Sequence, residues 1–376
     1  MAKLPTLMDG SVTRAKAQRS WWTTGVVVVV LAIAIFFTYH ARTGAVSDRI
    51  RNPGVSGAPR PVQYLFGISG STWATVAQLG TLIAMTAVVI VFVVAWRRRP
   101  GHPVLLMAIV TTLIIWLDPI TNWAPYGVYN PQVWHLPEDW PLVSISPTVQ
   151  PFVVLGYATF YLAPYFPAVW ILRRFQARRQ PDAFVWRHPL LSLAAIIFPL
   201  GFVLDAMLEI SAVRTGLYIY SQVVPFGSVF AGTAFQFPLL WVSLGVALVM
   251  VPVGVLLYVD DTGKSVAEKL AKRARIFVRY PKLGTFVVML AIMNVVYFVY
   301  VVEFTIIRWL DAATAVACPW PYPEAKVYDP QGLYQKSGQP GPYSAGILSG
   351  WATGQPHGSP EYESPAENGR CSPGNF

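Results

Sequence analysis

The chain has 376 residues, of which 54% are hydrophobic and only 12% are charged, about half the usual charged share of a soluble domain. This balance excludes an ordinary soluble fold and indicates an integral membrane protein. The net charge of +10 does not indicate a nucleic-acid-binding protein, because the basic residues form short clusters between apolar runs and read as topology signals. The two cysteines, Cys318 and Cys371, have no metal-binding spacing and are compatible with a disulfide or with two free thiols.

Seven apolar segments approach the length of about 20 residues that a membrane-spanning helix needs. The sequence therefore predicts an all-α, polytopic membrane bundle with about seven helices, at 21–39, 73–96, 103–120, 151–172, 189–210, 228–259 and 284–308. The first helix is expected to be an uncleaved anchor, with a cleaved signal peptide as the alternative. The sixth is too long for one straight span, so Pro238 and Pro252 kink it or its first turns lie outside the membrane core.

Lysine and arginine define the expected orientation of these helices. With seven alternating spans, 19 of the 28 basic residues fall on the side of the N-terminus, and the 33-residue stretch 118–150 on the other side has none. The positive-inside rule then places the N-terminus in the cytoplasm and the C-terminus outside, in a multi-pass protein of the cell membrane. A short amphipathic helix is expected near Lys269, where its basic residues meet lipid headgroups.

The chain divides into five expected regions. They are a basic cytoplasmic N-terminus (1–20), a membrane anchor (21–39), an extracytoplasmic linker (40–72), a membrane core (73–310) and a tail rich in Pro, Gly and Ser (311–376). The tail has no apolar periodicity and is expected to be disordered or loosely attached.

Five carboxylates lie in or beside the apolar segments, where a charge costs roughly 3 kcal/mol or more at the membrane centre. Asp118, Asp205, Glu209 and Glu303 gather toward the outer face, whereas Asp260 falls in a turn at the inner boundary. Such groups are expected to have a function, although carboxylates near helix ends can also reach the interface or pair with arginines as packing contacts.

Asp205 and Glu209 are the strongest functional candidates among these carboxylates. They are four residues apart and share one face of a helix. Two carboxyl groups this close in a poorly solvated site resist ionising together, which gives one acid and one base for general acid–base catalysis. Arg214 is expected to hold the ionised partner or to bind an anionic group of a substrate.

The polar residues of the core also form motifs in a characteristic order. These are Trp116 and Asp118 with Asn122; Tyr129 and Asn130; Asp205 and Glu209; Arg214, Tyr218 and Tyr220; Gly232 and Gln236; and Asp260, Asp261 and Gly263. Over roughly residues 73–310 this order resembles the AveC-like spirocyclase family of actinobacterial polytopic membrane proteins. The family is associated with closing a dihydroxy-ketone polyketide into a spiroketal, and with dehydrating that ring in its founding member.

This resemblance implies a cyclase or dehydratase that acts on a hydrophobic hydroxylated polyketide or lipid, with no cofactor and no metal. The implied catalytic residues are Asp118, Asp205 and Glu209, and the implied supporting or substrate-binding residues are Asn122, Tyr129, Asn130, Arg214, Tyr218, Gln236 and Glu303. The expected partners are the substrate and membrane lipids, without nucleic acid.

Two other functions fit parts of the sequence. A non-enzymatic lipid carrier or an accessory subunit of an envelope transport complex fits the membrane acids and the external tail. A proton-coupled channel or sensor is disfavoured, because its acids would be spread through the membrane depth rather than gathered at one level.

Overall fold

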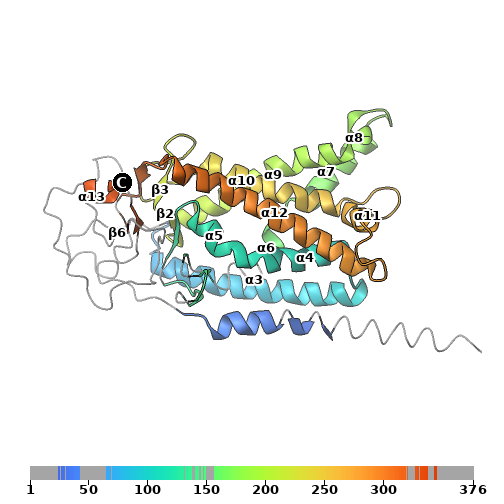
Figure 1. Cartoon of the computed structure of the whole chain (residues 1–376), viewed down its shortest axis with the longest axis horizontal. Helices are drawn as coiled ribbons and strands as arrows, with labels where there is room; N and C mark the ends of the chain where they lie inside the picture. The colour runs from blue at the N-terminus through green and yellow to red at the C-terminus, as the bar shows by residue number, and fades with distance from the viewer. Residues whose placement is uncertain are drawn as a thin grey trace, which may run out of the picture.

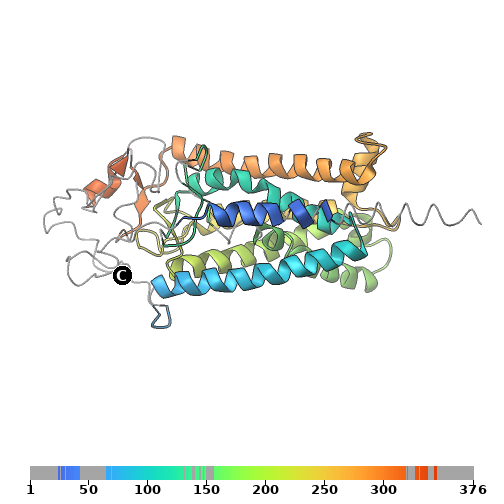
Figure 2. The ribbon, with the colours of Figure 1, turned by 90° about the horizontal axis from the view of Figure 1, so that it is seen from below.

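The structure is a computed structural model of an elongated helical bundle (Figures 1 and 2). It describes residues 24–42, 65–149 and 156–318, with gaps at 26, 30, 69, 131, 138, 139, 144 and 147, and then 320, 327–329, 331–337, 343 and 344. Within these described residues, five helices are long and apolar enough to cross a membrane: Thr72–Arg98, Pro103–Trp123, Pro189–Arg214, Leu239–Leu257 and Pro281–Trp309.

Three long helices form the centre of the bundle. α10 (Leu239–Leu257) packs against both α9 (Pro189–Arg214) and α12 (Pro281–Trp309). The backbones of α9 and α10 approach closely at Gly201, where an added Cβ would lie 2.8 Å from the Met250 sulfur. This close approach fixes the part of α9 that carries Asp205 against the start of α10.

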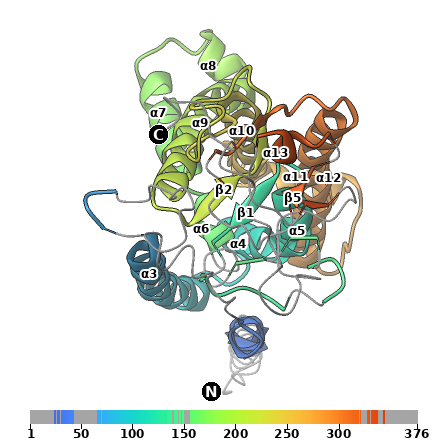
Figure 3. The same cartoon turned by 90° about the vertical axis from the view of Figure 1, so that its left-hand side faces the viewer.

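The second predicted span is the long helix α3 (Gly70–Arg98), and it lies at the edge of the bundle (Figure 3). Only 6% of its most apolar window is buried inside the protein, so most of its apolar surface faces outward. A short apolar helix, Val27–Tyr39, occupies part of the predicted anchor, and residues 1–23 lie outside the described part of the chain.

The third predicted span is helical but irregular. α4 (Pro103–Leu113) continues into one 3₁₀ turn, η1 (Ile114–Leu117), and then into α5 (Asp118–Trp123). Pro119 has no N–H and cannot continue a regular α-helical ladder, so the helix changes character at Asp118. The predicted carboxylate therefore lies at a break in the helix rather than on a smooth face.

The fourth and sixth predicted segments differ from single straight helices. The segment 151–172 does not form one helix but contains α6 (Gly156–Phe160), a turn, and α7 (Tyr165–Ala177). The division occurs because Pro164 and Pro167 lie close together and have no backbone N–H for a helical hydrogen bond. Residues 151–155 lie outside the described residues. In the sixth segment, α10 begins only at Leu239, so residues 228–238 form turns before the helix, one of the two outcomes expected for a segment of this length.

Short strands gather at one end of the bundle, called here the strand end (Figure 1). β1 (Gly127–Tyr129) pairs antiparallel with β2 (Tyr218–Tyr220), with Val128 opposite Ile219. β3 (Gln222–Val223) pairs antiparallel with β4 (Ala315–Val316), and β5 (Val327–Tyr328) pairs in parallel with β6 (Tyr343–Ser344).

Part of the tail that was expected to be disordered packs against this strand end. Trp320 and Tyr334, the latter in the short helix α13 (Leu333–Lys336), are buried together with Val316 and Ile219. The Tyr334 hydroxyl donates a hydrogen bond to the Ser221 carbonyl. Two large aromatic side chains thus hold a Pro/Gly-rich segment that lacks any apolar periodicity. Residues 345–376 lie outside the described residues.

Arg308 joins the last long helix to the strand end. Its guanidinium donates to the carbonyl oxygens of Trp123 and Ala124, the latter at 3.0 Å, and lies over the rings of Trp123 and Tyr126 at 4.2 and 3.8 Å. This buried arginine fixes the end of α12 against α5.

The opposite end of the bundle carries α8 (Phe184–Arg187) and α11 (Val266–Arg273). The predicted amphipathic helix is present as α11, and Ser265 and Glu268 form a capping box at its start. Asp260 lies in the preceding turn, as predicted, where it accepts from Thr262 and pairs with Lys269.

Candidate functional site

Three of the predicted catalytic carboxylates gather at the strand end, inside the bundle. Asp118 begins α5, while Asp205 and Glu209 lie in the last third of α9. Asp118 and Asp205 are each only 1% exposed, and Glu209 is half-buried. Carboxylates so far from water need polar partners, so the hydrogen bonds around them define what the site can do.

Asp118 is held by hydrogen bonds from helix α6 and from its own helix. Its Oδ2 accepts from Asn122 Nδ2 at 2.8 Å, one helical turn later, and its Oδ1 accepts from the Tyr157 hydroxyl on α6. Asn122 in turn accepts from the Tyr218 hydroxyl of β2 at 3.3 Å. The Tyr218 hydroxyl reaches this position because Gly127 has no side chain; a Cβ there would collide with it.

A chain of tyrosine hydroxyls extends from Asp118 across the bundle. The Tyr297 hydroxyl of α12 donates to the Tyr157 hydroxyl at 3.1 Å, and it also hydrogen-bonds the Tyr161 hydroxyl in the turn after α6. Tyr161 and Tyr297 are 3% and 4% exposed, so the chain is shielded from water. Such a chain can hold or pass a proton between buried groups.

Glu209 has a tyrosine partner of its own. The Tyr220 hydroxyl of β2 donates to Glu209 Oε2 at 3.0 Å. Burial first, and then the Glu209 charge, raise the pKa of Tyr220 well above its ordinary value, so this phenol stays protonated as a donor. Tyr218 packs edge-to-face between Tyr129 and Tyr220, with ring centroids 4.6 and 5.0 Å away, and so links the surroundings of Asp118 and Glu209.

Asp205 differs from the other two carboxylates. Among the described residues, neither of its oxygens has a hydrogen-bond partner, and the same holds for the hydroxyl of Ser243, which is fully buried on α10. The Ser243 hydroxyl lies close enough to be a potential donor to Asp205 but falls short of hydrogen-bond geometry, and the Asp205 charge also acts on Tyr161 and Tyr300. Asp205 therefore belongs to the same buried layer, but its hydrogen-bonding capacity is unused.

Four supporting residues predicted from the sequence have other surroundings. Gln236 is fully buried and connects backbone groups: its Nε2 donates to the carbonyls of Tyr220 and Ser221, and its Oε1 accepts from the Gly232 N–H at 2.9 Å. Asn130 likewise donates to the Gly216 carbonyl at 2.9 Å. Both amides therefore hold the loops of the strand end together.

The other two supporting residues carry charge. The Arg214 guanidinium lies over the rings of Phe230 and Phe235, at 4.9 and 4.5 Å, and among the described residues no ion pair joins it to Glu209. Glu303 is half-buried on α12, beside Gly245 of α10.

The sequence reasoning missed the tyrosines of the apolar segments. Tyr157 and Tyr161 are spaced four apart and Tyr297 and Tyr300 three apart, so each pair lies on one helical face. That spacing in the sequence was a signal for a polar cluster, because a buried tyrosine usually needs a hydrogen-bond partner for its hydroxyl. Among the described residues, no group of three or more His, Cys, Asp or Glu side chains could hold a metal ion.

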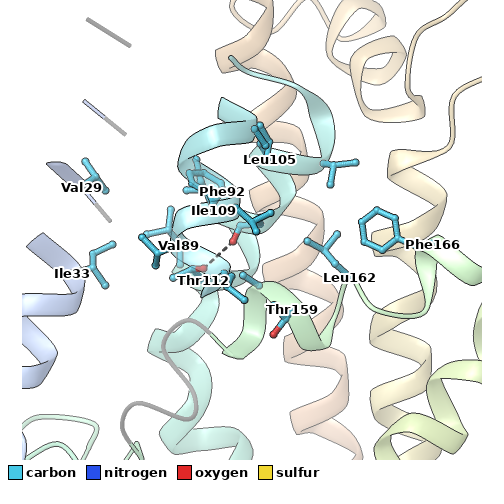
Figure 4. A pocket seen from close by; sticks show the side chains of 17 residues that line it. Val29, Ile33, Val89, Phe92, Leu105, Ile109, Thr112, Thr159, Leu162 and Phe166 are labelled. Atoms are coloured by element: carbon cyan, nitrogen blue, oxygen red, sulfur yellow. Dashed lines mark hydrogen bonds between the residues drawn. The ribbon is translucent and has the colours of Figure 1, made fainter. Parts of the chain in front are cut away.

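An apolar cavity of about 370 Å³ lies beside the site, between α3, α4, α6 and the N-terminal helix (Figure 4). Its walls include Phe92 and Ile109, and the hydroxyls of the two threonines in its lining, Thr112 and Thr159, donate to carbonyls of their own helices at 2.8 and 2.9 Å. The cavity thus offers almost no polar group to a ligand. α6 lies between the two features, since Ala158 and Thr159 line the cavity while Tyr157 contacts Asp118.

The fold and the site define a mostly helical protein whose described residues include five candidate membrane-spanning helices, with buried carboxylates and tyrosines gathered at one end. The family model described as "Spirocyclase AveC-like" matches residues 96–328, more than half of the chain. The chain belongs to this family, which confirms the resemblance seen in the sequence. No curated protein and no solved structure matches it.

Proposed function

We propose that this protein is a membrane-embedded cyclase or dehydratase that acts on a hydrophobic hydroxylated polyketide or lipid by carboxylate general acid–base catalysis. The observation that carries the proposal is the buried layer of Asp118, Asp205 and Glu209 among tyrosines, whose hydroxyls donate to Asp118 and to Glu209. Membership of the AveC-like spirocyclase family supports a cyclase-type activity.

The proposed reaction loses one water and forms one new C–O bond. A carboxylic acid protonates a hemiketal hydroxyl, whose C–O bond breaks and releases water, leaving an oxocarbenium-like species. A second hydroxyl of the same molecule attacks that carbon, and a carboxylate takes its proton. Asp205 and Glu209 are the proposed acid–base pair, and Asp118 is proposed to orient the substrate and stabilise the developing positive charge.

The surroundings of the carboxylates modify the supporting roles expected from the sequence. Tyr220 rather than Arg214 is the hydrogen-bond partner of Glu209, so we assign Arg214 to an anionic group of the substrate instead. Asn122 donates to Asp118 and accepts from Tyr218, and Tyr129 packs against Tyr218. Glu303 is the weakest candidate, and Asn130 and Gln236 act by shaping the strand end.

A hydrophobic substrate fits the rest of the molecule. The cavity beside α6 is apolar, and the long helices present apolar surface from which a lipid-soluble molecule can approach. We further propose a multi-pass protein of the cell membrane, with the α6–α7 region as an additional span, the N-terminus in the cytoplasm and the strand end outside. Cys318, at the strand end, is disulfide-bonded, which supports an oxidising compartment there; the other cysteine, Cys371, lies outside the described residues.

Metabolite profiling of a producing strain tests this function. Deleting the gene should convert a hydrophobic product into a precursor that is heavier by one water, and the wild-type gene should restore the product. Asp205→Asn and Glu209→Gln should each lower product formation by about a hundredfold or more, the usual contribution of general acid–base catalysis. Asp182→Asn, at an exposed loop carboxylate, is the matched control. Wild-type product levels in both site variants would overturn the assignments.

The alternative function is a non-enzymatic lipid carrier or an accessory subunit of an envelope transport complex, and the apolar cavity favours it. A carrier would leave the covalent structure of its lipid unchanged. Co-purification of an unaltered lipid and of an ATPase, together with a deletion strain whose metabolites keep their masses, would support the carrier over the enzyme.

A further inference from the structure

Asp205 and Ser243 are two buried polar side chains on adjacent helices with unused hydrogen-bonding capacity. Asp205 is 1% exposed and Ser243 is fully buried, yet among the described residues neither Asp205 oxygen has a hydrogen-bond partner and the Ser243 hydroxyl has none either. A buried polar group without a hydrogen bond is unfavourable. The Ser243 hydroxyl lies close enough to Asp205 to be a potential donor, but the pair falls short of hydrogen-bond geometry, which indicates a position where a third polar group can bridge them.

The surroundings of this position restrict what can bind there. The charge nearest to this position is that of Asp205, and Glu209 lies one turn further along α9. The Asp205 charge also acts on the phenols of Tyr161 and Tyr300. An anion would be repelled by the two carboxylates. A divalent cation needs about six oxygen ligands, and the described residues provide no cluster of three acidic or metal-ligating side chains.

A neutral hydroxyl satisfies both groups. Its O–H can donate to an Asp205 oxygen, and its lone pairs can accept from the Ser243 hydroxyl. We propose that Asp205 and Ser243 bind one hydroxyl of a hydrophobic alcohol, the substrate of the reaction proposed above, on which this inference rests. Ser243 is then a positioning residue, because it orients the hydroxyl that Asp205 protonates or deprotonates.

A substrate alcohol and a bound water both carry a hydroxyl that fits this position. An experiment on the purified full-length protein in lipid nanodiscs distinguishes binding of the alcohol from binding of water. The apolar reagent dicyclohexylcarbodiimide modifies membrane carboxylic acids, and mass spectrometry measures the rate of its attachment to Asp205. The probe ligand is 1,2-decanediol. Decane, which has the same chain without hydroxyls, is the matched control.

The expected result is saturable protection of Asp205 by the diol, about tenfold at ten times its half-effect concentration. Ser243→Ala should raise that half-effect concentration about fivefold, the effect of one lost hydrogen bond. Ser211→Ala, at an exposed serine of the same helix α9, should leave it unchanged. Modification of Asp260, at the opposite end of the bundle, should not respond to the diol, which controls for general effects on the reagent.

Three results would overturn the inference. Equal protection by decane would show that chain insertion alone is measured, and no protection at the solubility limit of the diol would mean that the position holds only water. Protection by sodium ions without diol would indicate a cation site. If the diol protects Asp205 through Ser243 while Asp205→Asn leaves the metabolite product unchanged, the binding site stands and the proposed function fails.

Discussion

At the scale of single residues, the site is defined by which carboxylate has a partner. Asp118 is held by Asn122 and Tyr157, and Glu209 by Tyr220, whereas Asp205 has none. The spacing of Asp205 and Glu209 in the sequence predicted that they share a helical face, but it could not distinguish their surroundings. Those depend on β2, α6 and α10, which reach the site from distant parts of the chain.

Tyr157→Phe tests the hydrogen bond that fixes Asp118. The variant keeps the ring but removes one of the donors to Asp118, so it should lower the free energy of unfolding by about 1.5–3 kcal/mol, the range for hydrogen bonds to charged groups. Thermal unfolding of the purified protein in detergent measures this loss. Tyr280→Phe, at a half-exposed tyrosine before α12, is the matched control. Equal stability of the two variants would argue against a structural role for the Tyr157 hydroxyl.

Residues whose role depends on backbone partners were the hardest to predict. The family resemblance named Gln236 and Asn130 as supporting or substrate-binding residues without showing which of the two roles each has. In the structure their amides are largely used by carbonyl and N–H groups of the loops, which no sequence pattern shows. The tyrosines were missed for the opposite reason, since an aromatic residue in an apolar segment resembles ordinary packing.

At the scale of elements, hydropathy predicted the helices well where they are regular, and less well where proline interrupts them. The spans 189–210 and 284–308 correspond to α9 and α12, although both helices begin earlier or end later than their apolar stretches. The segment 151–172 is divided at Pro164, and Tyr157 on the short helix α6 and Tyr161 in the turn after it reach Asp118 and Tyr297.

The start of α4 provides a pH-dependent test at this scale. His102 caps the helix by accepting from the Val104 N–H at 3.3 Å, which requires a neutral imidazole. Burial first, and then the charge of Arg99, lower the pKa of His102 below its ordinary value of 6.5. The cap therefore contributes its full stability above pH 6.5, and this contribution is lost as the pH falls through the lowered pKa.

Replacing His102 by a cap that does not titrate should remove this acid sensitivity. His102→Asn should keep the cap and lose less stability on acidification than the wild type, whereas His102→Ala should cost about 1 kcal/mol at neutral pH. Thermal unfolding at neutral and mildly acidic pH measures both effects. His188→Asn is the control, because His188 precedes α9 without making a side-chain cap bond. An unchanged acid loss in His102→Asn would contradict the assignment.

At the scale of the whole molecule, the two ends of the bundle differ in charge and in structure. The end with α8 and α11 carries the basic loops, and the strand end carries the buried carboxylates, the disulfide-bonded Cys318 and the packed tail residues (Figure 1). Composition and loop charge predicted this polarity. The packing of Trp320 and Tyr334 on the strand end could not be predicted, because a few aromatic anchors in a Pro/Gly-rich segment leave no periodic signal.

Labelling from outside the cell tests the proposed orientation. A cysteine at the strand end, Phe226→Cys, should react with a membrane-impermeant maleimide in intact cells, because Phe226 is 76% exposed there. A cysteine in the basic loop, Asp182→Cys, should react only after the cells are opened. The wild type gives the background signal. The reverse pattern would place the strand end in the cytoplasm.

The central claim is that the buried carboxylates carry out a cyclisation. The most direct test incubates the purified protein in lipid nanodiscs with the precursor that accumulates in the deletion strain, and follows its mass over time. We predict that the wild type converts the precursor into a product lighter by one water, and that Asp205→Asn does so at least about a hundredfold more slowly. A wild type that leaves the precursor unchanged, or an Asp205→Asn variant that converts it at the same rate, would contradict this function.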